Sequence, residues 1–143
     1  MAALESLVRV HKWVLNEKRQ KLAALEELIA RMRADVERLE ADLEQEREAA
    51  TENAAGTVAF PAFVAAAMER RKRQRRTIAE LESAAEAARD EVHAAFQDLK
   101  AYEMARDKHE REEAERLNRQ ERSTLDELGL DMYRRGGGHG AGD

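Results

Sequence analysis

The sequence predicts an all-α protein: a long two-helix antiparallel coiled-coil hairpin with an overhanging C-terminal helix and a disordered glycine-rich tail. Three observations support this prediction. The 143 residues are 38% charged and 4% aromatic, with one proline and no cysteine, a composition typical of long helices. Apolar residues recur at alternating steps of four and three in two long stretches. The segment between those stretches carries turn signals, so one chain can supply both helices.

The first helix is expected over about residues 3–50, where a heptad repeat persists over several turns. Its a positions are all aliphatic: Val8, Leu15, Leu22, Ile29, Val36 and Leu43. Its d positions are more mixed: Leu4, His11, Lys18, Leu25, Met32, Leu39 and Glu46. We interpret His11 as a polar layer that fixes the register of the helix pair at some cost in stability. This narrow apolar seam requires a second helix to cover it.

The turn is expected over residues 51–57, where the heptad pattern stops. This segment contains Asn53 and Gly56, and Pro61 follows in what would be the first turn of a new helix. A short connection between two helices makes them antiparallel neighbours, so residues whose numbers sum to about 108 are expected to face one another. Leu43 would then face the region of Val64.

The second helix is expected over about residues 58–133, with a slimmer, alanine-rich stripe. The stripe consists of Phe60, Val64, Ala67, Ile78, Leu81, Ala85, Ala88, Val92, Ala95, Leu99 and Tyr102. Arg71 and Gln74 interrupt it, which predicts a locally weakened or strained hairpin. Beyond Tyr102 the helix has no partner and is expected to overhang. Residues 1–135 therefore form a single predicted hairpin, and residues 136–143 a disordered tail.

The sequence contains no residue set expected of an enzyme, so no catalytic, cofactor-binding or metal-binding residue is predicted. Asp90 and His93 share one helix face, but a metal site in a helical bundle needs a second such pair on another helix. No apolar run reaches the roughly 20 residues that span a bilayer. Residues 1–17 lack the features of a signal peptide. We expect a cytoplasmic protein without membrane insertion that contacts other proteins.

The densest charge cluster lies early in the second helix and is a candidate contact site. It consists of Arg70, Arg71, Lys72, Arg73, Arg75 and Arg76. As a recognition site it could bind an acidic protein surface, lipid headgroups or RNA. The net charge of -5 and the lack of interleaved aromatic residues argue against nucleic acid. Alternatively the cluster pairs within the hairpin, because Asp35, Glu37 and Glu40 lie opposite it in the predicted register.

Three aromatic residues are further candidates for partner binding: Trp13, Phe60 and Phe63. Trp13 falls at an f position, away from the seam, so either the C-terminal segment or a partner is expected to cover it. Aromatic anchors are frequent hot spots of interfaces, which favours a partner. Phe60 and Phe63 lie near the turn, where they either close the end of the hairpin or contact a partner.

Two runs of sequence resemble the FliJ family. The run from Leu7 to Arg19, followed by Leu22 and Leu25, is similar to the opening of FliJ proteins, especially those of alphaproteobacteria. The run from Phe60 to Val64 and the basic stretch after it are similar to the entry of the FliJ second helix. The resemblance spans residues 1 to about 120.

The resemblance implies a coiled coil like the γ subunit of rotary ATPases and a non-catalytic stalk of the flagellar type III export apparatus. Its implied partners are the hexameric export ATPase, the cytoplasmic region of the export gate and the export chaperones, at the inner face of the cell membrane. Of the family's gate-contacting pattern only Phe63 matches well, whereas Ala67, Arg70 and Gln74 depart from it. The alternative is a cytoplasmic coiled-coil scaffold or adaptor unrelated to secretion.

Overall fold

Two long helices make up the chain. The computed structural model describes the backbone of residues 2–52 and 54–140, and the side chains of residues 2–52 and 58–136. Helix α1 covers Ala2–Glu52 and helix α2 covers Ala54–Gly140, and the described residues include no strand. The predicted all-helical fold of two long helices packed against each other is confirmed.

Both helices extend beyond their predicted bounds. Residues 51–52 belong to α1 and α2 begins at Ala54, and residue 53 lies outside the described residues. Pro61 therefore lies inside α2 rather than in its first turn. Alanine is the strongest helix former, and the alanines before Pro61 offset the backbone hydrogen bond that the proline removes.

The C-terminal end of α2 also differs from the expectation. Helix α2 continues to Gly140 and so includes part of the segment predicted to be disordered, 136–143. Residues 141–143 lie outside the described residues. Disorder of the tail stays a prediction.

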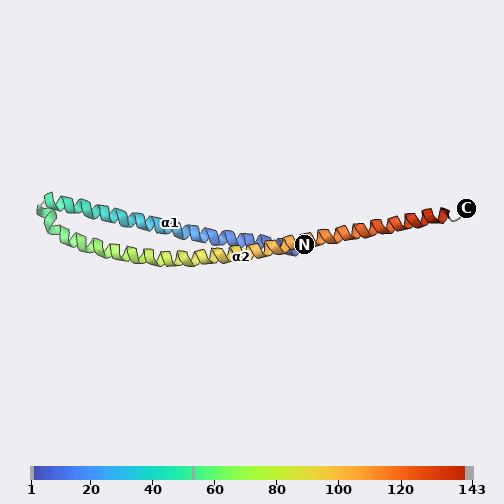
Figure 1. Ribbon diagram of the computed structural model, residues 1–143. Helices are drawn as coiled ribbons and strands as arrows, with labels where there is room; N and C mark the ends of the chain where they lie inside the picture. Colours follow the sequence, from blue (N-terminus) through green and yellow to red (C-terminus); the bar gives the residue numbers. More distant parts are fainter. Residues whose placement is uncertain (1, 53, 141–143) are drawn as a thin grey trace. The chain divides into compact units, whose positions relative to one another are not determined.

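The chain divides into two compact units, and His11–Gln97 form the larger one. In this unit the two helices run antiparallel, side by side (Figure 1). The order of the ion pairs between them shows the direction, because partners of successive α1 residues lie progressively earlier in α2. These pairs are Lys18–Glu91, Arg33–Glu82 and Glu40–Arg75.

The core of this unit is an asymmetric seam. Helix α1 contributes large aliphatic side chains, of which Leu15, Ile29, Val36 and Leu39 are buried. Helix α2 contributes small ones, the buried Ala67, Ala85, Ala88 and Ala95. The predicted a positions of this unit are all buried or half-buried, whereas Glu46, a predicted d position, is exposed. Burial of one Leu or Ile contributes about 1.5–3 kcal/mol, so α1 supplies most of the hydrophobic stabilisation.

Ion pairs flank the seam and alternate in sign. Three of them, here called the flanking ion pairs, join e positions of both helices: Glu26–Arg89, Arg33–Glu82 and Glu40–Arg75. Sliding one helix by a heptad in either direction would bring like charges together, with Arg33 facing Arg75 or Arg89. The alternation therefore specifies one register. The predicted register was wrong because it placed Arg33 opposite Arg75, whereas Glu82 occupies that place.

The second unit comprises Met1–Val10 and Asp98–Asp143. Val8 and Leu99 are its buried residues, and Leu4 and Tyr102 are half-buried, as their seam positions predict. All residues of 114–136 are exposed, including six large hydrophobic side chains: Leu117, Leu125, Leu128, Leu130, Met132 and Tyr133. An overhang of this segment stays a prediction. Across the described residues, neither helix has a stretch long and apolar enough to span a bilayer.

Candidate functional site

The basic cluster of α2 separates into two groups with different surroundings. Arg71 and Arg75 face α1, and their guanidinium groups lie 3.6 Å and 3.2 Å from Oε1 of Glu40. The other four members are exposed and make no ion pair within the described part of the chain: Arg70, Lys72, Arg73 and Arg76. Pairing within the hairpin thus accounts for two of the six cations.

Their counter-charge is only partly the one expected. Glu40 serves two arginines, whereas Asp35 pairs with Arg38 on its own helix. An i, i+3 partner is always within reach on a helix, so it competes with a partner across the seam. Lys72, Arg73 and Arg76 therefore keep a net positive charge on the outer face of α2, and Arg70 adds a charge at the edge of that face nearer α1.

Phe63 and Arg70 line one shallow hollow between the two helices. The hollow has a volume of about 220 Å³, and α1 contributes Leu39 and Asp42 to it. Phe63 is 39% exposed, whereas Phe60 is half-buried. Of the two rings, Phe60 contributes more to the seam and Phe63 presents more surface to a partner.

Trp13 is the most exposed aromatic side chain among the predicted contact residues. It lies on α1 and is 63% exposed. Its f position in the heptad directs it away from α2, as the sequence predicts. Because the indole is exposed, covering it with a partner's surface would bury a large apolar area, so Trp13 is available as an anchor for a partner.

Gln74 places a polar group in the seam of α2. Its Oε1 atom is buried and has no hydrogen-bond partner. A buried acceptor without a partner costs about 1–3 kcal/mol relative to an exposed one. With Arg71 at the preceding seam position, it gives α2 two successive seam residues that add little apolar burial. Local weakness of the hairpin here stays a prediction, and the unpaired oxygen supports it.

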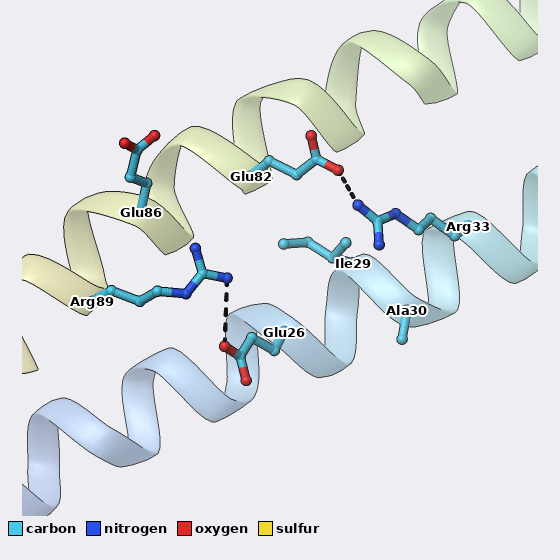
Figure 2. Close-up of a pocket in the computed structure, with 7 residues that line it drawn as sticks. All are labelled: Glu26, Ile29, Ala30, Arg33, Glu82, Glu86 and Arg89. Atoms are coloured by element: carbon cyan, nitrogen blue, oxygen red, sulfur yellow. Dashed lines mark hydrogen bonds and ion pairs between the residues drawn. The ribbon is translucent and has the colours of Figure 1, made fainter.

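A second hollow, of about 490 Å³, lies beside Ile29 and is lined mainly by charged residues. Figure 2 shows two of the flanking ion pairs crossing between the helices there, one from Arg33 to Glu82 and the other from Arg89 to Glu26. The latter two groups are 3.6 Å apart. The charges within these two pairs neutralise each other and help hold the helices together, and Glu86 adds one further carboxylate to the lining.

Glu91 is the centre of a further group that sequence reasoning missed. Its carboxylate lies 3.3 Å from Nζ of Lys21 and 3.5 Å from Nζ of Lys18. The hydrogen bond from Lys21, assisted by the charge of Lys18, lowers the pKa of Glu91. In the sequence, Lys18 stands out only as a polar residue in the seam. The heptad position of Glu91, beside the seam of α2, was the signal from which its pairing with Lys18 and Lys21 could have been predicted.

Sequence reasoning also missed two exposed apolar residues of α2, Val58 and Met68. They lie outside the heptad stripe, and from that position their exposure could have been predicted. Among the described residues, no group of three or more His, Cys, Asp or Glu side chains is placed to hold a metal ion.

The antiparallel helix pair and its exposed aromatic and basic residues define a coiled-coil protein that presents contact surfaces. The chain belongs to the FliJ family, because the family model described as "Flagellar FliJ protein" matches residues 1–138. No curated protein and no solved structure matches the chain significantly. The resemblance read from the sequence is confirmed and extends further than residue 120.

Membership in this family gives the chain a role related to flagellar protein export. It associates the chain with the export apparatus. The match lends no support to a scaffold unrelated to secretion.

Proposed function

We propose that the chain is a stalk of the flagellar type III export apparatus, which binds the hexameric export ATPase and stimulates its hydrolysis. The same stalk links the ATPase to the export gate and to substrate chaperones at the inner face of the membrane. The observation that carries this proposal is the family match over residues 1–138. The antiparallel helix pair of His11–Gln97 is consistent with a stalk, because its narrow seam leaves most of each helix surface to partners.

The surface of this helix pair suits a partner that must be released again. Outside the seam it is mostly charged, and exposed charged contacts contribute little net binding energy. Large exposed apolar side chains such as Trp13 and Phe63 are available at separate points. A hexameric ATPase ring that binds the charged surface weakly can release it again, whereas binding at the exposed apolar side chains is stronger.

Stimulation of the export ATPase from the same organism tests the proposal. Adding the chain should raise the rate of ATP hydrolysis and the fraction of ATPase that elutes as a hexamer, and the two proteins should co-elute. Trp13→Ala should weaken this stimulation. Leu28→Ala, a change at a less exposed apolar residue of the same helix, is the matched control. No stimulation and no co-elution at high protein concentration would contradict the proposal.

Binding to the cytoplasmic region of the export gate tests the second contact. Phe63→Ala should weaken this binding and leave the helical circular dichroism unchanged. Phe96→Ala is the matched control, since Phe96 is 40% exposed and lies on the same helix. If both variants bind equally well, Phe63 does not contact the gate. If Phe63→Ala lowers the helical signal, its role is structural.

A further inference from the structure

Four cations of α2 make no ion pair to α1 in the part of the chain that the structure describes. Arg70, Lys72, Arg73 and Arg76, here called the outward cations, are exposed and make no ion pair within the described residues. They lie within seven residues of one helix, in a chain whose net charge is -5. Like charges this close repel one another, so the cluster carries a small cost in stability that the fold itself does not offset.

The surface around the outward cations combines positive charge with exposed apolar groups. With 3.6 residues per turn, positions 58, 62, 65, 69, 72 and 76 form one column on the outer side of α2. Val58, at one end of this column, is 84% exposed, and Lys72 and Arg76 are at the other. Met68, beside the column, is also exposed. Glu69 is the one acidic residue in the column.

We propose that this outer face of α2, residues 58–76, binds the headgroups of anionic phospholipids at a bilayer surface. Clusters of four or more Lys and Arg side chains on a helix bind anionic lipids electrostatically. Three of the outward cations are arginines, whose planar guanidinium groups bind phosphate oxygens in pairs. Exposed apolar side chains beside the cations, here Val58 and Met68, are typical of helices that lie at the boundary of headgroups and acyl chains.

Two other classes of ligand fit this face less well. RNA would require aromatic side chains among the cations for base stacking, and the column contains none. An acidic protein surface would account for the cations but would leave Val58 without a role. The proposal requires neither the ATPase nor the gate, so its failure and that of the stalk proposal are distinguishable.

The expected affinity follows from the number of cations. Each Lys or Arg close to an anionic bilayer strengthens partitioning by about fivefold. Replacing Arg73 and Arg76 by glutamine should therefore weaken binding by about 25-fold. The matched control is the pair Arg19→Gln and Arg31→Gln, which removes the same charge from exposed residues of α1 that make no ion pair among the described residues.

Sedimentation with vesicles tests the proposal on the purified full-length chain. The probes are vesicles of phosphatidylcholine alone and of phosphatidylcholine mixed with phosphatidylglycerol. The chain should bind the mixed vesicles and not the neutral ones, and rising salt should release it. The control variant should bind within about twofold of the unchanged chain, well short of the effect of one cation. Circular dichroism should show both variants equally helical.

Three outcomes would overturn the proposal. The first is no binding to the mixed vesicles at low salt. The second is equal loss of binding in the Arg73/Arg76 variant and in the control, which would indicate a response to net charge alone. The third is tighter binding to soluble polyglutamate or to RNA than to the mixed vesicles, which would assign the face to an acidic protein or a nucleic acid.

Discussion

Replacing Gln74 by methionine is expected to stabilise the helix pair. Methionine has nearly the same length and volume as glutamine, so the change removes the buried Oε1 atom, which has no partner, without leaving a cavity. A buried unpaired acceptor costs about 1–3 kcal/mol, and the half-buried position of Gln74 places the gain near the lower end, about 1–2 kcal/mol. In urea unfolding followed by circular dichroism, the midpoint should rise by about half a molar or more.

The matched control is Gln97→Met, the same change at an exposed position of the same helix. It should alter the free energy of unfolding by less than about 0.5 kcal/mol, as is usual for surface substitutions. A Gln74→Met variant that unfolds at the same or a lower urea concentration would refute the reasoning. The Oε1 atom would then have a stabilising partner in solution.

Three further predictions concern charge and exposure. Arg33→Glu should destabilise the chain by roughly 0.5–1 kcal/mol, because the flanking ion pairs are solvent-exposed, and adding Glu82→Arg should restore most of the loss; a double variant as unstable as the single one in urea would contradict the pairing. Lys21 and Lys18 lower the pKa of Glu91, so the ionised carboxylate stabilises the folded chain above pH 4.5, and this stabilisation is lost as the pH falls below 4.5. When the pH is lowered through this range, the urea midpoint of Glu91→Gln should therefore change less than that of the unchanged chain. The indole of Trp13 should emit as a water-exposed tryptophan and be quenched by acrylamide, with shielding when a partner binds; a blue-shifted emission from the free chain would mean that the indole is already covered.

The seam could be predicted from the sequence because heptad spacing reports burial directly. The a positions from Val8 to Leu43 and the alanine stripe of α2 are buried or half-buried in the structure. Glu46, a polar d position that breaks the apolar pattern, is exposed, and the seam resumes at Ala50, the next a position, which is buried.

The register could not be predicted from turn signals alone. Placing the turn between Asn53 and Gly56 ignored the helix propensity of the neighbouring alanines, and it set Arg33 against Arg75. The charges at the e positions could have given the correct register, because shifting either helix by one heptad would separate Arg33 from Glu82 and Glu26 from Arg89. Charge on the flanks therefore adds information that the apolar pattern lacks.

The surroundings of the candidate contact residues could be predicted only in part, and their contact with a partner stays a prediction. The basic cluster was visible as a run of letters, whereas its division into paired and unpaired cations depends on which of them reach Glu40. Trp13 was assigned to the outer face correctly because an f position follows from the frame. Identifying what binds these residues requires knowledge of the partner, which a single sequence does not contain.

The alanine seam of α2 has a mechanical consequence. Small side chains interlock little with the large aliphatic side chains of α1, so they offer little resistance to axial sliding of one helix along the other. Resistance to load along the helices then comes mainly from the alternating charges on the flank, which favour the observed register over a shift of one heptad in either direction. In single-molecule pulling along the helix axis, the force needed for sliding should fall as ionic strength rises, because salt screens exposed charges and leaves apolar contacts intact.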